Sequence, residues 1–182
     1  MKELLNIIDD GDQIIGEKTR EKIHKEGLLH REIHVYFVTP NKEIIFQHRA
    51  KSKETYPDLL DATVGGHVEI GHSYEQTALK ETEEETGLEI KATDLMFLNK
   101  TKVRAEDGVT GKINNAIRHS YVYLFRGVIN DLKIEEGKAL GFEAWPIKKL
   151  ENLNEDDKKR FIPYILEFAA TEITKYIDKD KA

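Results

Sequence analysis

Three of the four glutamates between positions 81 and 85 are the residues whose types and spacing most directly predict chemistry. Glu81, Glu84 and Glu85 are three and four positions apart, which places their side chains on one face of a helix. Because three carboxylates on one face repel each other, a cation is needed to compensate them. Hard divalent ions take oxygen ligands, and Mg²⁺ is usually held by one or two carboxylates plus substrate phosphates. We therefore expect a Mg²⁺ site on this helix, which Mn²⁺ could also fill.

The alternative interpretation of residues 83–85 is a charged run on a solvent-exposed helix face. A pair of glycines favours the metal site. Gly65 and Gly66 lie between a strand-like run and the loop before the helix, where bare backbone can approach a ligand or offer a carbonyl oxygen. The chain has no cysteine, which excludes thiolate metal sites, disulfides and a cysteine nucleophile. Any metal must therefore be held by oxygen or imidazole donors.

Composition limits the class of protein. Hydrophobic residues make up 39% and charged residues 34% of the 182 positions, which is typical of one globular domain with a solvated surface. The net charge of -6 is a poor match to general nucleic-acid binding, so no stable nucleic-acid complex is expected. No apolar run approaches the roughly 18 residues of a membrane span, and the first residues lack a signal-peptide core. We expect a cytoplasmic protein without a membrane partner.

An α/β (α+β) arrangement with a mixed sheet is expected to position the glutamates. Ser73 and Gln76 form a capping-box pattern and Gly87 is typical of a helix C-terminus, which predicts a helix between them. Apolar residues at four-residue spacing predict an amphipathic helix over residues 156–179. The remaining expected elements are a hairpin at 4–16, strands at 34–39, 43–48, 61–64, 95–101, 121–128 and 142–145, and a long loop at 105–115.

The segment from Gly66 to Leu88 resembles the signature of the Nudix hydrolases: Gly, five residues, Glu, seven residues, Arg-Glu, an aliphatic residue, any residue, Glu-Glu, any residue, Gly and an aliphatic residue. The positions that match with intact spacing are Gly66, Glu81, Glu84, Glu85, Gly87 and Leu88. The resemblance implies an α/β/α sandwich with a central catalytic helix and a C-terminal helix. It also implies hydrolysis of a diphosphate bond in a nucleoside diphosphate-linked or related small substrate by metal-activated water.

By this resemblance, Glu81, Glu84 and Glu85 hold the metals and one of them takes a proton from the attacking water. A backbone carbonyl of Gly65 or Gly66 completes the metal ligands.

Three positions depart from the signature, namely His72 in place of its first Glu, Lys80 in place of Arg, and Thr82 in place of the aliphatic residue. In the family the first Glu and the Arg brace each other, so both members of a supporting pair have changed, and Lys80 is expected to orient the carboxylates less firmly than Arg. Activity could be weak or altered for this reason. His72 could ligate metal, contact substrate or do neither.

Further residues are candidates for contacts around the diphosphate. Arg49 and Arg31 could hold the outer phosphate, although a strand-end arginine is also a common surface residue. A further acidic residue often assists in this family, and the sequence offers three candidates without choosing among them, namely Glu135, Glu136 and Glu143.

The frame around the signature also resembles one branch of the family, type I isopentenyl-diphosphate isomerase and the isomerase-like Nudix hydrolases. Residues 29–31, 47–49 and 56–61 carry this resemblance together with His67, which is expected to contact substrate or to be satisfied by local backbone. The isomerase moves a proton with a cysteine where this chain has Gly65, and the metal-binding glutamate pair of the isomerase is absent. A hydrolase is therefore favoured over an isomerase-like protein. A catalytically weak nucleotide-binding sensor is a further alternative.

We expect a single Nudix domain over residues 1–182. It would comprise an N-terminal hairpin extension at 1–30, a core at 31–150 and a C-terminal helix at 151–182. The hairpin could cover a sheet edge or pack on a second copy of the chain, so a homodimer is one expectation.

Overall fold

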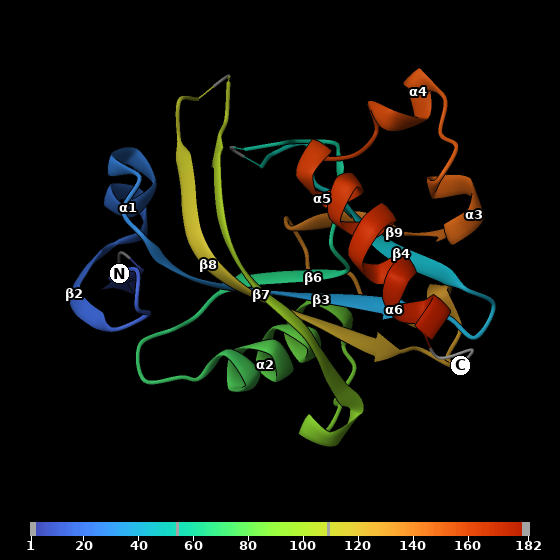
Figure 1. Cartoon of the computed structure of the whole chain (residues 1–182), viewed down its shortest axis with the longest axis horizontal. Coiled ribbons are helices and arrows are strands. Elements are labelled where there is room, and N and C mark those ends of the chain that lie inside the picture. Colours follow the sequence, from blue (N-terminus) through green and yellow to red (C-terminus); the bar gives the residue numbers. More distant parts are fainter. Residues whose placement is uncertain (1–2, 54, 109, 180–182) are drawn as a thin grey trace.

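A seven-stranded mixed sheet forms the centre of the computed structural model, which describes residues 3–53, 55–108 and 110–179 (Figure 1). The main path of strands is β5-β4-β3-β8-β7, with β6 paired to β3 and β9 paired to β4. The strands are β3 (His30–Val38), β4 (Glu43–Arg49), β5 (Leu60–Asp61), β6 (Val64–His67), β7 (Leu95–Glu106), β8 (Ile113–Leu124) and β9 (Ala139–Pro146). β3 and β8 are parallel, whereas the other pairs are antiparallel.

The pairing of β3 changes partner along its length. β6 pairs with residues 32–35 of β3, while β4 pairs only with residues 37–38. β4 and β6 therefore pair with different parts of β3, and the short strand β6 carries Gly65 and Gly66 beside the middle of β3. Both faces of β3 are buried, and its second half, residues 35–38, is apolar throughout.

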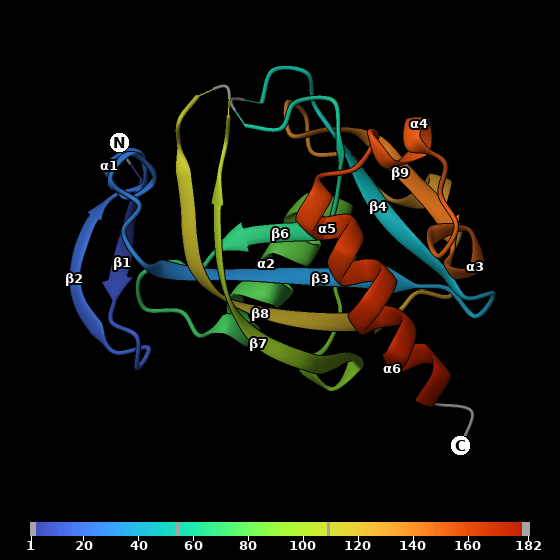
Figure 2. The ribbon, with the colours of Figure 1, turned by 45° about the horizontal axis from the view of Figure 1, so that its top comes forward.

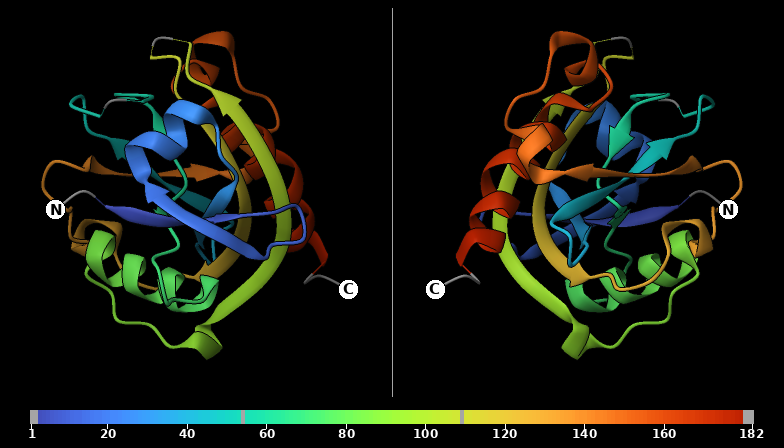
Figure 3. Two further views of the ribbon diagram at one scale, coloured as in Figure 1. Left: turned by 90° about the vertical axis from the view of Figure 1, so that its left-hand side faces the viewer. Right: turned by 90° about the vertical axis from the view of Figure 1, so that its right-hand side faces the viewer.

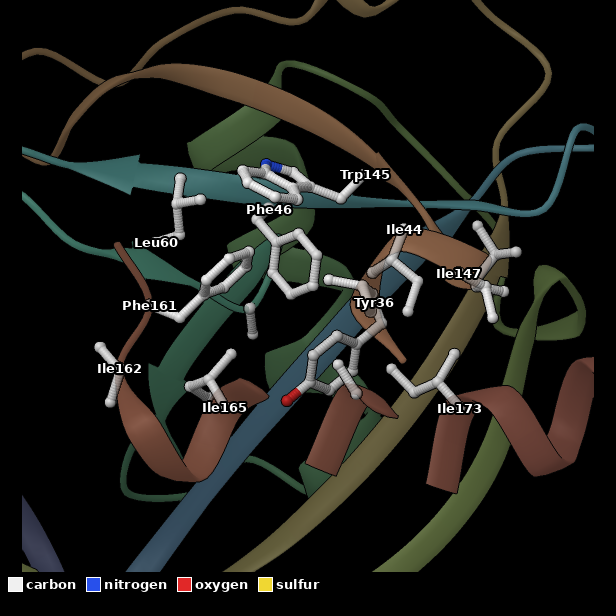
Figure 4. Close-up of a cluster of buried hydrophobic side chains, with 14 of the residues drawn as sticks. Tyr36, Ile44, Phe46, Leu60, Trp145, Ile147, Phe161, Ile162, Ile165 and Ile173 are labelled. Carbon is white, nitrogen blue, oxygen red and sulfur yellow. The ribbon is translucent and has the colours of Figure 1, made fainter. Parts of the chain in front are cut away.

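Helices cover both faces of the sheet, as expected for an α/β/α sandwich (Figure 2). Helix α2 (Tyr74–Thr86) packs on the face that includes Ile33, Val35 and Phe37. The opposite face packs against the C-terminal helical segment, which consists of α5 (Pro163–Phe168), a π-helical turn at Ala169–Ile173 and α6 (Thr174–Lys179). Figure 4 shows this second core, where Tyr36 and Phe46 of the sheet meet residues of the C-terminal segment.

The N-terminal segment forms a hairpin of β1 (Leu4–Ile8) and β2 (Ile14–Thr19), followed by helix α1 (Arg20–Glu26) (Figure 3, left). Ile8 and Leu29 pack on Ile117 of β8, which fixes the hairpin to one end of the sheet. Helix α1 was not expected, although Thr19 caps it by accepting a hydrogen bond from the backbone of Lys22.

Two predicted elements are corrected by the structure. Residues 105–115 are not a long loop but the tip of a hairpin, because β7 and β8 pair continuously from Leu95↔Tyr123 to Glu106↔Ile113 apart from one bulge. The C-terminal helix begins at Pro163 rather than at residue 156, and residues 155–158 form the separate short helix α4 (Glu155–Lys158). Proline lacks a backbone N–H and is favoured in the first turn of a helix, so it starts a new helix here.

The remaining short elements are a 3-10 turn at Ala92–Asp94, a second at Ile129–Asp131, and helix α3 (Ile147–Leu150). Among the described residues, no helix is long and apolar enough to cross a membrane.

Candidate functional site

Helix α2 presents the three glutamates and has the ends that its sequence predicts. The Ser73 hydroxyl accepts a hydrogen bond from the backbone of Gln76 at 3.1 Å, and the Gln76 side chain accepts one from the Ser73 backbone at 2.9 Å. Gly87 ends the helix in the left-handed conformation, with φ of 72°. Local signals therefore determine where this helix starts and stops.

The three glutamates differ in their surroundings. Glu81 and Glu85 are 8% and 4% exposed, whereas Glu84 lies in solvent. Glu85 Oε2 accepts hydrogen bonds from Gln47 Nε2 at 3.0 Å and from the Gly65 backbone at 3.4 Å. Burial raises the pKa of Glu85 to about 7 and also raises the pKa of Glu81. Two buried carboxylates side by side need a cation. The interpretation of this segment as a charged, solvent-exposed helix face does not explain why they are buried.

The glycines stand on opposite sides of β6. A Cβ at Gly66 would lie 2.6 Å from the Glu81 carboxyl carbon, so only glycine leaves room for that carboxylate. A Cβ at Gly65 would instead meet the ring of His34 at 3.2 Å on the other side. The structure thus brings both glycines to the glutamates, Gly66 by close packing and Gly65 by its backbone N–H.

Lys138, which the sequence alone did not single out, supplies the cation of this cluster. Its Nζ lies 2.9 Å from Glu135 Oε2, 3.6 Å from Glu85 Oε1 and 3.7 Å from Glu81 Oε2. The structure places the three candidates for a further acidic residue in different surroundings. Glu135 joins the cluster, Glu136 is exposed, and Glu143 pairs with Arg160 at 2.6 Å.

Lys80 has a carboxylate partner, although not at the position that the signature predicts. Its Nζ lies 2.6 Å from Glu69 Oε1 and 3.4 Å from Glu84 Oε1. The Lys80 hydrogen bond lowers the pKa of Glu69. His72 is a half-buried neighbour, with Nδ1 3.3 Å from Glu69 Oε2. The changed pair of the signature is thus matched here by an ion pair between Lys80 and Glu69, a residue three positions before His72.

The predicted substrate-binding arginines are held by other parts of the protein. Arg49 Nη1 lies 2.7 Å from Asp61 Oδ2, and the same guanidinium donates to the carbonyls of Thr55 and Tyr56. Arg31 Nε lies 2.6 Å from Asp12 Oδ1 in the N-terminal hairpin.

A lysine next to Arg49 was not predicted. Burial lowers the pKa of Lys53, whose charge interacts with both Arg49 and Glu85. Lys53 is therefore close enough to Glu85 for their charges to interact, whereas Arg31 pairs with Asp12 of the hairpin.

His67 lies in a second cluster, away from the glutamates. Its ring contacts those of His24 in α1 and His30 in β3, with all three centroid separations at 5.1 Å. One ligand atom from each of the three rings lies within 4.8 Å of the other two. The sequence did not predict this cluster, because α1 and β6 meet only in the folded chain.

Burial favours the neutral form of the three imidazoles. Burial lowers the pKa of His24 to about 4 and the pKa of His67 well below its usual value. His30 Nδ1 donates to the Leu28 carbonyl, and within the described part of the chain its buried Nε2 has no hydrogen-bond partner. Neutral ring nitrogens are good ligands for zinc and other transition metals.

The fold and the glutamate cluster define a class of α/β protein whose central helix holds buried carboxylates beside a glycine pair. A model of the NUDIX domain matches residues 28–165, and the chain belongs to the Nudix hydrolase family.

The relatives agree with this assignment. An uncharacterised Nudix hydrolase of Clostridium acetobutylicum is 28% identical over 152 residues, which is 82% of this chain and 72% of that protein. Another, from Streptomyces coelicolor, is 36% identical over 85 residues, or 47% of each chain.

Two solved structures are similar in fold alone. A Deinococcus radiodurans protein has a TM-score of 0.66 at 20% identity, over 82% of this chain and 86% of its own. The NUDIX domain of Shewanella oneidensis NrtR, solved in complex with ADP ribose, has a TM-score of 0.59 at 14% identity, over 82% of this chain and 87% of its own.

Proposed function

We propose that this Nudix hydrolase splits the diphosphate bond of a small nucleoside diphosphate-linked or related substrate, using Mg²⁺ or Mn²⁺ held by Glu81, Glu84 and Glu85. The main support is that Glu81 and Glu85 are buried and share one cation, Lys138, with Glu135. The space left by Gly66 for the Glu81 carboxylate also fits a metal site. A magnesium or manganese ion would neutralise the diphosphate and lower the pKa of a bound water.

The residues of the chain prepare the carboxylates for this role. Gln47 and the Gly65 backbone hold Glu85 Oε2, which leaves Oε1 facing the centre of the cluster. Lys80 pairs with Glu69 and also with the exposed Glu84, so it restrains the position of the Glu84 carboxylate. Glu84 is the glutamate most open to a water or a substrate, and a carboxylate in that position can accept a proton.

The outer phosphate is expected to meet Arg49 and Lys53. The charge of Lys53 interacts with both Arg49 and Glu85, and an anionic substrate needs positive charge beside the metal. Arg31 is assigned to the N-terminal hairpin through Asp12. Two structures of similar fold support this substrate class: NrtR was solved with ADP ribose, and another neighbour is an Ap4A hydrolase of Caenorhabditis elegans. An isomerase reaction is not proposed, because Gly65 has no side chain to move a proton.

The three-histidine cluster supports a second metal. We propose that His24, His30 and His67 hold a transition metal such as Zn²⁺, because their ligand atoms converge and His30 Nε2 is buried without a partner among the described residues. This assigns His67 to a metal ligand set, in place of the direct substrate contact that the sequence suggested.

Release of phosphate or pyrophosphate from a panel of diphosphate compounds, with Mg²⁺ or Mn²⁺ and with EDTA as control, tests the hydrolase proposal. Metal-dependent release from one group of compounds is expected. Glu84→Gln and Glu85→Gln should each reduce the rate by at least a hundredfold while the circular dichroism spectrum is retained. Unchanged turnover in both variants would refute the assignment. Silence across the panel with clear metal binding would favour the sensor alternative.

A further inference from the structure

The ammonium group of Lys138 lies beside two of the three glutamates of the proposed metal site, Glu81 and Glu85. Its three carboxylate partners, Glu81, Glu85 and Glu135, come from helix α2 and from the turn before β9. The Lys138 backbone is fixed, since its N–H donates to the Glu135 carbonyl and its carbonyl accepts from Ala50. Its side chain is one-third exposed. The long side chain is therefore the movable part of this residue.

In the two buried glutamates, the carboxylate oxygens that remain for a metal are those that face Lys138. Glu85 Oε2 is already engaged by Gln47 and the Gly65 backbone, so Oε1, 3.6 Å from Lys138 Nζ, is the free oxygen. Glu81 Oε1 packs against Gly66, and its Oε2 lies 3.7 Å from the same ammonium. A metal that uses these oxygens must therefore occupy the space beside Lys138 Nζ.

A divalent ion and the ammonium cannot share that space. Mg²⁺ binds oxygen at about 2.0–2.1 Å and repels a neighbouring positive charge. We propose that Lys138 is an internal competitor for the metal, which holds the carboxylate cluster in the metal-free protein and must leave it before a divalent ion binds. This inference rests on the proposed function of the same glutamates.

Two consequences follow from this competition. Removing the Lys138 charge should make the metal bind more tightly, because binding no longer has to break three ion pairs. It should also lower the melting temperature in EDTA, because Glu81, Glu85 and Glu135 then lack a counter-charge. A lysine that merely supported the local fold would weaken metal binding when removed, so the direction of the change separates the two roles.

Mn²⁺ titration followed by electron paramagnetic resonance, on wild type and Lys138→Met, tests the inference. Lys148→Met is the matched control, since it removes the same charge from an exposed position on α3. We expect the Kd of Lys138→Met to be at least tenfold lower than that of wild type and the Kd of the control to be unchanged. An equal or higher Kd in Lys138→Met overturns the competitor role. Wild type that fails to bind Mn²⁺ would instead overturn the proposed function.

A second measurement needs no variant and so does not depend on how Lys138→Met folds. An amine-reactive reagent should modify Lys138 slowly without metal and faster with Mg²⁺, as followed by peptide mass spectrometry with Lys148 as internal reference. A rate at Lys138 that is unchanged or lower with Mg²⁺, under conditions where Mn²⁺ titration shows binding, would show that the ammonium stays in place.

Discussion

The Cβ that an alanine would add at Gly66 lies 2.6 Å from the Glu81 carboxyl carbon, so the glycine and the buried carboxylate occupy their positions only together. Substitution at Gly66 should therefore displace the Glu81 side chain although no residue of α2 is replaced.

Gly66→Ala is expected to weaken Mn²⁺ binding at least tenfold and to lower kcat/KM by about a hundredfold, since a shift of about 1 Å in a catalytic group can cost that much. Isothermal titration and steady-state kinetics measure the two effects. Gly16→Ala in β2 is the control, because its added Cβ meets no atom within 4 Å. Normal metal affinity in Gly66→Ala would contradict the position assigned to Glu81.

The pairing of Lys80 with Glu69 predicts which residue replaces the missing first Glu of the signature. Glu69→Gln should lower kcat by up to about fivefold, because an exposed pair contributes up to about 1 kcal/mol. His72→Gln should have a smaller effect, since the His72 ring contacts only Glu69 among the charged groups described here. A double-mutant cycle of Glu69→Gln with Lys80→Met should show coupling in kcat. If His72→Gln has the larger effect, Glu69 is not the bracing residue.

The raised pKa of Glu85 predicts how stability depends on pH without metal. Its pKa is about 7 in the folded protein, above its ordinary value, so the folded state binds more protons and is destabilised as pH rises from about 4.5 through 7. Buried histidines act oppositely below about pH 6.5, because their lowered pKa values make the unfolded chain bind more protons.

The difference between wild type and Glu85→Gln isolates the glutamate from the histidines. Melting temperatures in EDTA should show Glu85→Gln gaining stability relative to wild type as pH rises from 4.5 to 8. Mn²⁺ affinity of wild type should rise over the same range, because the ligand must be deprotonated. Parallel melting curves of the two proteins across this range would mean that the Glu85 pKa is not raised.

The histidine cluster predicts a metal that is independent of the glutamates. Zn²⁺ added to chelator-treated protein should bind at one site with high affinity, and His30→Ala should abolish that site. Mn²⁺ binding at the glutamates should persist in His30→Ala, because the two clusters use different residues. Equilibrium dialysis with metal analysis measures both. Full Zn²⁺ retention in His30→Ala would rule out this ligand set.

The partners of the two arginines predict different losses. Asp12 receives Arg31 at 2.6 Å, Lys100 at 2.8 Å and the Tyr74 hydroxyl, so Arg31→Met should cost about 1–3 kcal/mol of unfolding free energy with KM unchanged. Arg49→Met should raise KM for the diphosphate substrate. Chemical denaturation and kinetics of both variants make the comparison. A raised KM in Arg31→Met would return that residue to the substrate site.

Helix α2 shows how much local sequence can determine. Ser73, Gln76 and Gly87 define its ends, and three-and-four spacing puts its glutamates on one face, because capping and helical periodicity depend on residues within a few positions. The hairpin tip at residues 105–115 was missed because its polar, glycine-containing sequence pairs only through partners across β7 and β8. The start of the C-terminal helix was missed because periodicity alone does not show where Pro163 begins it.

The sequence by itself determined the family resemblance, the helix and the carboxylates, whereas the partners of those carboxylates were decided by the tertiary structure. Lys138 meets Glu85 across more than fifty positions of chain, and His24 meets His67 across more than forty. Neither pair leaves a periodic or capping signal, because such contacts arise only when β6, α1 and the turn before β9 pack around the sheet. The charges that surround the glutamates therefore follow from the packing of distant segments, while the glutamates themselves follow from helical spacing.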